Sequence, residues 1–146
     1  MCIRDSYDGE RRNPWNEFEC GSNYARSMAS YALLNAFSGF EFDMTKGLIG
    51  FAPLIPQPAL PSEEFRCFWS LDSGWGEYME TANSAEIRVL SGSLDLQKVR
   101  LAALVGKSPT AVKLGSKGLK GTFQNGEVQF SARTTIKSGG SLTIGW

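Results

Sequence analysis

The expected fold depends on residues 22–51, which read SNYARSMASYALLNAFSGFEFDMTKGLIGF. In the first half of this stretch, alanines recur every three or four residues and bulky apolar side chains fill most of the other faces, which predicts a helix over Ser22–Phe37. Ser22 or Asn23 can cap its start, and Gly39 suits the position just past its end. A helix that is apolar nearly all round is normally buried among other helices. The sequence offers no second helix of comparable strength, so we expect its packing partners to lie outside this chain.

After Gly39 the apolar period changes from 3.6 to 2, which is typical of strands. Phe40–Asp43 and Leu48–Phe51 predict a hairpin, and Asn125-Gly126 is a strong signal for a type I′ turn. A turn is also predicted at Ser91-Gly92-Ser93. Further short strands are predicted at residues 65–71, 76–79, 85–90, 94–104, 110–114, 122–123, 128–130, 133–137 and 141–144. The expected fold class is therefore α+β: one long buried helix followed by a mostly antiparallel β region, either a meander or a sandwich.

Composition excludes several classes of function. Apolar residues make up 42% and charged residues 21% of the 146-residue chain, which is typical of a globular protein, and the formal net charge is zero. That balance lacks the basic excess of a nucleic-acid-binding protein, and no apolar run is long enough for a transmembrane segment. The chain has no histidine and three cysteines without regular spacing, so we expect no metal site and no cofactor.

The segment richest in chemistry is Arg11–Gly21, which reads RRNPWNEFECG just before the predicted helix. Carboxylates and guanidinium groups bind vicinal sugar hydroxyls through charge-assisted hydrogen bonds, and an aromatic ring such as that of Trp15 packs on the apolar face of a pyranose. A solvated loop leading into a helix is the alternative. Arg26 falls in the first turn of the helix, where a cation opposes the helix dipole at a cost of about 0.3–1 kcal/mol. It either points to a ligand at the helix mouth, together with Glu17, or extends to solvent, or pairs with a carboxylate of a neighbouring helix.

The motif Asn13–Gly21, followed by Tyr24-Ala25-Arg26 and Met28-Ala29-Ser30, resembles the end of the catalytic domain of glycoside hydrolase family 116. That family includes bile-acid-type β-glucosidases and glucosylceramidases, and the resemblance extends from about Arg12 to Trp75. It implies an (α/α)6 barrel in which Ser22–Phe37 is one of the last helices. It also implies that Glu17 and Arg26 bind sugar hydroxyls, with Trp15 as a further substrate-binding candidate. The catalytic glutamate and aspartate of the family lie upstream, so no catalytic residue is assigned within this chain.

The expected organisation has three parts. Residues 1–6 resemble a non-native lead, residues 7–61 the C-terminal part of the barrel domain, and residues 62–146 a β-rich C-terminal region. The resemblance implies a retaining exo-β-glycosidase, acting on a β-linked glycoside or glycolipid, whose other partner is the remainder of the catalytic domain. The alternative is a non-catalytic carbohydrate-binding or structural β module. For such a module Trp69 and Trp75 are candidates for a sugar platform, although core packing is the favoured interpretation of both.

One prediction follows directly from the missing carboxylates. The purified 146-residue chain should not hydrolyse an aryl β-glucoside, because a retaining mechanism needs a nucleophile and an acid/base residue that this chain does not provide. Release of the chromogenic aglycone is the measurement. Turnover by a pure sample would contradict this prediction.

Overall fold

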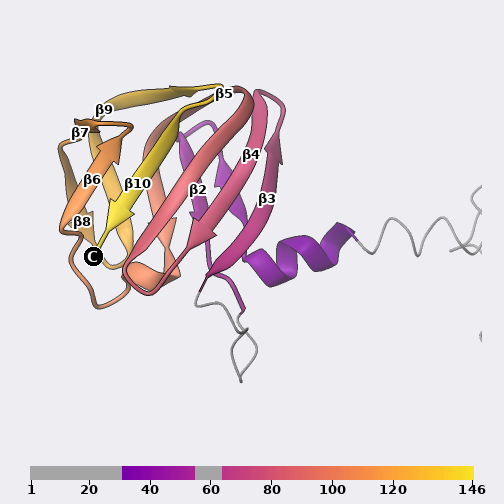
Figure 1. The fold of residues 1–146 in the computed structure, drawn as a ribbon, viewed down its shortest axis with the longest axis horizontal. Coiled ribbons are helices and arrows are strands. Elements are labelled where there is room, and N and C mark those ends of the chain that lie inside the picture. The colour runs from indigo at the N-terminus through magenta and orange to yellow at the C-terminus, as the bar shows by residue number, and fades with distance from the viewer. Residues whose placement is uncertain (1–30, 55–63) are drawn as a thin grey trace, which may run out of the picture. The chain divides into compact units, whose positions relative to one another are not determined.

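The computed structural model describes residues 31–54 and 64–146. The chain divides into two compact units, residues 1–35 and residues 36–146. Apart from the end of a helix over residues 31–38, the described residues of the second unit form ten strands and one short 3-10 helix, η2 (Figure 1). These elements are β1 (Glu41–Asp43), β2 (Leu48–Phe51), β3 (Phe65–Leu71), β4 (Gly74–Glu80), β5 (Ser84–Leu101), η2 (Ala102–Leu104), β6 (Ala111–Leu114), β7 (Lys117–Gly118), β8 (Gly121–Gln124), β9 (Glu127–Lys137) and β10 (Ser141–Gly145).

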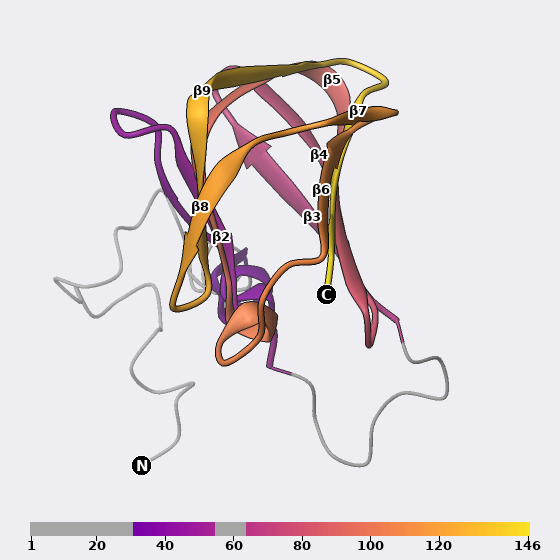
Figure 2. The same ribbon diagram turned by 90° about the vertical axis from the view of Figure 1, so that its left-hand side faces the viewer.

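The 18-residue strand β5 connects two halves of the sheet. Its first part pairs with β4 and β10, giving the order β3-β4-β5-β10-β6-β7. Its second part pairs with β2 in parallel and with β9 antiparallel, giving the order β1-β2-β5-β9-β8. Figure 2 shows β6 and β10 on one side of this unit and β2 and β8 on the other. The sheet is thus folded into two layers, and β5 runs from one layer to the other.

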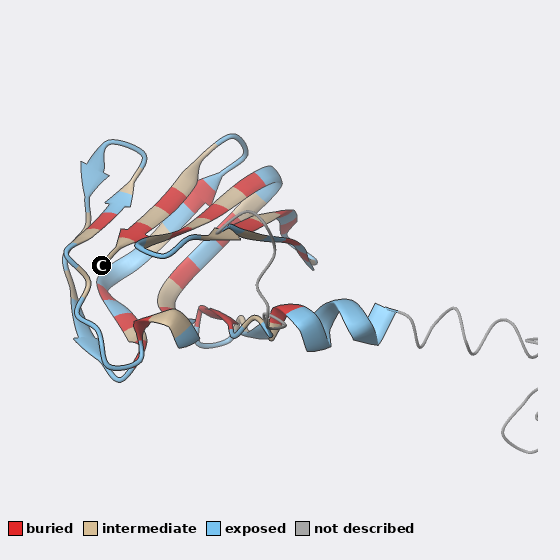
Figure 3. Ribbon diagram, turned by 60° about the horizontal axis from the view of Figure 1, so that its bottom comes forward, coloured by how far each residue is buried: buried red, intermediate tan, exposed pale blue. Residues whose placement is uncertain are grey.

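The core lies between the two layers. Buried and exposed residues alternate along most strands, as the bands of Figure 3 show, because successive side chains of a strand point to opposite faces. The first half of the sheet contributes Trp69, Tyr78 and Ile87, and the second half contributes Ile49 and Phe51 among others, all in one apolar cluster. The rings of Phe51 and Tyr78 stack with their centroids 3.9 Å apart. This contact joins β2 of one layer to β4 of the other.

The predicted α+β class with one long buried helix is wrong. The described residues contain one 8-residue helix, over residues 31–38, and the rest of their regular structure is a mixed, mostly antiparallel sheet, apart from the short η2. Residues 31–37 are exposed: Tyr31 exposes 72% of its surface and Phe37 53%. Apolar periodicity shows which faces of a helix can be buried, but burial also needs other elements that pack against those faces. The described residues contain no other α-helix. The position of Gly39 is confirmed, since it follows the helix with a φ of +57°.

The predicted turn at Ser91-Gly92-Ser93 is also wrong. The chain stays extended from Ser84 to Leu101, and Gly92, with a φ of +78°, pairs with Gly74 two residues after Leu90, which the register of β5 with β4 skips. Between the pairs Trp75↔Ser91 and Gly76↔Val89 the register shifts, as in a β-bulge. A glycine that can end a strand can also bend one, and here it lets β5 pass from one layer to the other. The sheet is mostly antiparallel, as expected, and the parallel pairing of β2 with β5 is a feature that the sequence did not predict.

The two predicted hairpins are confirmed. Phe42 of β1 pairs with Ile49 of β2, and Gln124 of β8 pairs with Glu127 of β9. Asn125 and Gly126 both have positive φ, 46° and 83°, as a type I′ turn requires at its two central positions. These turns were predictable because their backbone demands a particular residue type.

Gly76 provides a test of how tightly the first layer packs on the core. A Cβ at this position would lie 1.8 Å from the carbonyl oxygen of Arg88 and 2.9 Å from the Trp69 ring. Gly76→Ala should therefore lower the free energy of unfolding by about 1–3 kcal/mol, as overpacking does. The measurement is the urea midpoint of the full chain. Gly118→Ala is the matched control, because no atom lies within 4 Å of its Cβ position, and it should change stability by less than about 0.5 kcal/mol. Equal midpoints for the two variants would contradict this packing.

Candidate functional site

The three substrate-binding candidates, Trp15, Glu17 and Arg26, lie outside the described residues. Their proximity, and their relation to a sugar site, therefore stay predictions. The described residues contain a different set of exposed aromatic and charged side chains, on the β-sheet unit.

Trp69 and Trp75 lie on opposite faces of the β3–β4 hairpin. The hairpin turns at Asp72 and Ser73, so that Leu71 pairs with Gly74, Trp69 with Gly76 and Ser70 with Trp75. Trp69 is 1% exposed and belongs to the core, whereas Trp75 is 43% exposed on the outer face. The prediction of core packing is confirmed for Trp69 and wrong for Trp75. The two tryptophans can be distinguished from the sequence by the alternation of side chains along the hairpin. With a two-residue turn at residues 72–73, positions 69 and 75 fall on opposite faces.

Trp75 forms an exposed aromatic pair with Phe68 of β3. Phe68 is 45% exposed, and the two ring centroids lie 5.8 Å apart with the ring planes tilted by 42°. Their sequence neighbours Cys67, Trp69 and Gly76 are buried, so both rings belong to the outward-facing set of side chains. The pair therefore presents two aromatic rings to solvent at one side of the first layer.

A row of polar residues continues from the aromatic pair across the same face. Phe68 of β3 is in register with Glu77 of β4, Glu77 with Arg88 of β5, and Arg88 with Ser141 of β10. We call Phe68, Glu77, Arg88 and Ser141 the outer row. Adjacent strands lie about 4.8 Å apart, so the row extends about 14 Å across four strands. Past Phe68, Arg88 donates hydrogen bonds, Glu77 accepts them, and Ser141 can do both.

Both arginines on this face form ion pairs with glutamates. The Arg66 guanidinium lies 2.9 Å from Glu64, and that of Arg88 lies 3.2 Å from Glu86. The hydrogen bond to Glu64 raises the pKa of Arg66, and the charges of Glu77 and Glu86 act in the same direction. Both arginines therefore have acidic neighbours, and the face carries no block of one charge.

A second polar cluster crosses the outer face of the other layer. Arg100 of β5 contacts Glu41 of β1 at 3.0 Å and Glu127 of β9 at 2.9 Å, and Lys98 contacts Glu127 at 2.9 Å. Gly50 of β2 lies in register between Glu41 and Arg100. A Cβ on Gly50 would lie 2.6 Å from Glu41 Oε1, so a larger residue there would displace the Glu41 carboxylate from its present position in the ion pair. With each charge facing an opposite one, the cluster links β1, β5 and β9.

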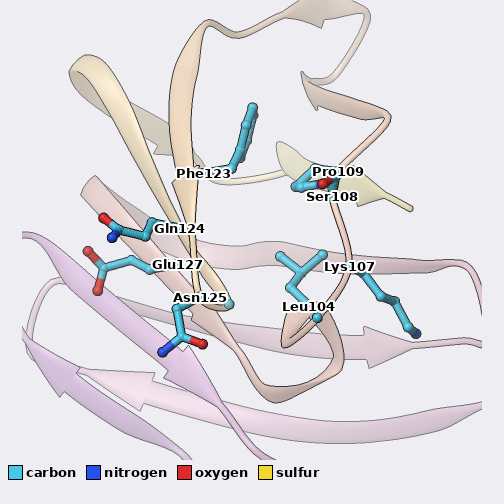
Figure 4. Close-up of a pocket in the computed structure, with 10 residues that line it drawn as sticks. Leu104, Lys107, Ser108, Pro109, Phe123, Gln124, Asn125 and Glu127 are labelled. Carbon is cyan, nitrogen blue, oxygen red and sulfur yellow. The ribbon is translucent and has the colours of Figure 1, made fainter.

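A cavity of about 310 Å³ lies between residues 104–109 and the β8–β9 turn (Figure 4). Its two charged lining residues are engaged elsewhere. Glu127 is bound to Lys98 and Arg100, and the Lys107 ammonium lies 5.1 Å from the centre of the Trp146 ring. Figure 4 shows the side chains of Glu127 and Lys107 extending away from each other. The cavity thus lacks convergent charged groups.

Other site chemistries receive no support from the described residues. Burial raises the pKa of the Cys67 thiol to about 12, so the thiol stays protonated at neutral pH and is a poor nucleophile. Within residues 31–54 and 64–146, no three His, Cys, Asp or Glu side chains gather in a way that could hold a metal ion. In the same part of the chain, no helix has the length and apolar character needed to span a membrane.

No protein-family model matches this chain, and no curated protein matches its sequence.

The cluster of Glu41, Lys98, Arg100 and Glu127, called the ionic cluster below, predicts how stability should depend on pH. The hydrogen bond from Lys98, aided by that from Arg100, holds the pKa of Glu127 below its ordinary value of 4.5. A carboxyl with a lowered folded-state pKa stabilises the protein above its unfolded-state pKa, and that contribution is lost as pH falls through the folded-state pKa. Glu127→Gln should therefore lower the free energy of unfolding at pH 7, by up to about 1 kcal/mol. The difference from wild type should shrink below pH 4.

Urea unfolding at several pH values is the measurement. Glu64→Gln is the control, because its ion pair with Arg66 has both side chains more than 40% exposed, and such pairs contribute little. A difference between wild type and Glu127→Gln that is the same at pH 7 and pH 3 would show that the carboxylate charge does not stabilise the fold.

Proposed function

We propose that this chain is the C-terminal portion of a retaining exo-β-glycosidase similar to glycoside hydrolase family 116. The observation that carries the proposal is the motif Asn13–Gly21 followed by Arg26, which combines an aromatic ring, carboxylates and a guanidinium group within 14 residues of sequence. Such a set suits a sugar, whose hydroxyls take charge-assisted hydrogen bonds and whose ring face takes aromatic packing.

The exposed helix supports a larger domain around this motif. Tyr31, Leu33, Leu34 and Phe37 are each more than 40% exposed along one short helix. Large apolar side chains concentrated on a helix are normally covered by other helices. The remainder of the parent enzyme would supply that cover.

In this proposal Glu17 and Arg26 bind the sugar ring on the side away from the scissile bond, and Trp15 packs beside it. The chemistry needs two upstream carboxylates about 5–5.5 Å apart, one acting as nucleophile and the other as acid and then base. Binding of the non-reacting part of a sugar contributes to the rate when it aligns the reacting carbon with the nucleophile. This chain would thus form one wall of the pocket that holds the terminal sugar.

The test uses the enzyme that includes the upstream carboxylates. Glu17→Ala and Arg26→Ala should each lower kcat/KM for an aryl β-glucoside by roughly 10- to 100-fold, the size expected for losing hydrogen bonds to a charged group. Glu127→Gln is the control, since its carboxylate belongs to the ionic cluster of the β-sheet unit, and it should leave kcat/KM unchanged. Unaltered kinetics in both Glu17→Ala and Arg26→Ala would overturn the site assignment.

A further inference from the structure

The outer face of β3, β4, β5 and β10 combines features that suit a ligand different from the one proposed for Glu17 and Arg26. The aromatic pair lies at the β3–β4 side of this face, and the outer row leads from it across the neighbouring strands. We propose that this face is a non-catalytic binding site for a neutral oligosaccharide. The inference stands on its own, whether or not the chain belongs to a glycosidase.

The exposure of the aromatic pair favours a sugar ligand. A cross-strand aromatic pair stabilises its hairpin by about 0.2–1 kcal/mol, and that benefit does not require the rings to face solvent. Phe68 and Trp75 leave 45% and 43% of their surfaces exposed on the outer face. An aromatic face is a suitable surface for the C–H groups of a pyranose, which are apolar on one side of the ring. The rings are therefore placed to receive a sugar.

The charges of this face favour a neutral ligand over a polyanion. Arg66 and Arg88 each lie within 3.2 Å of a glutamate, Glu64 and Glu86 respectively. A polyanion such as a nucleic acid would need a surplus of positive charge, which this face lacks. A guanidinium group beside a carboxylate instead offers donors and acceptors together, which is what vicinal hydroxyl groups need.

The length of the outer row favours an oligosaccharide over a single sugar. The outer row runs for three strand spacings, about 14 Å, from Phe68 to Ser141. A single pyranose stacked on the aromatic pair would not reach Arg88 and Ser141 together. A chain of linked sugars lying across the strands would contact the rings at one end and the polar residues further along.

The experiment is calorimetric titration of the full chain with glucose and with soluble β-1,3- and β-1,4-linked glucose tetrasaccharides. At least one tetrasaccharide should bind at least about tenfold more tightly than glucose, and its affinity should not change between low and high salt, because the ligand is neutral. Tetrasaccharides that bind no better than glucose, or do not bind, would overturn the proposal.

Variants localise the site. Trp75→Ala and Phe68→Ala should each weaken tetrasaccharide binding about tenfold, close to the upper end for one aromatic contact, whereas Trp75→Phe should retain most of it. Phe123→Ala is the matched control, because Phe123 is equally exposed, at 45%, but belongs to β8 of the other layer. Thermal melting checks that each variant is folded.

Two further outcomes would count against the proposal. Equal loss of binding in Phe123→Ala and Trp75→Ala would place the ligand elsewhere. Reversible self-association that Trp75→Ala abolishes, without sugar binding by the wild type, would show that the aromatic pair contacts protein instead. Sedimentation velocity at several concentrations distinguishes this case.

Discussion

The pairing of β5 along its whole length is the constraint on which the rest of the β-sheet unit depends. Four strands, β2, β4, β9 and β10, bond directly to it, and every other strand of the sheet is attached through one of these four. Because β5 passes from one layer to the other, it also sets how the two layers face each other. The buried residues Val89, Leu94 and Leu96 lie close to the bend, so both layers pack against the strand that connects them. A single cooperative core follows from this arrangement.

Alternation along β3 and β4 explains why the inner and outer faces have such different character. The same hairpin places Trp69 and Tyr78 in the core and Phe68 and Trp75 outside. Since successive residues of a strand point to opposite faces, the short turn at residues 72–73 decides which aromatic residues stabilise the fold and which remain available for a ligand. Function and stability are thus distributed between neighbouring residues of one hairpin.

Turns that require a positive φ were predictable from the sequence, whereas the pairing of strands far apart in the chain was not. The Asn125-Gly126 turn and the position of Gly39 depend on positive φ, which few residues adopt readily. The parallel pairing of β2 with β5 joins residues about 50 positions apart, and neither strand carries a local sign of its partner. Gly92 shows the intermediate case, because a glycine with positive φ permits both a turn and a bend within a strand, and tertiary pairing selects between them. For the candidate site, the sequence showed that aromatic residues were present in this segment. Predicting that Trp75 is exposed also required the register of the β3–β4 hairpin.

Gly50 leads to a consequence for how this sequence can change over evolution. The Arg100–Glu41 ion pair passes over a strand position that has no side chain, so the glycine and the two charges form one unit although they lie on three strands. In related sequences, a larger residue at position 50 should accompany loss of the charges at positions 41 and 100. Positions 41, 50 and 100 would then covary, although position 50 carries no charge and makes no ion pair itself.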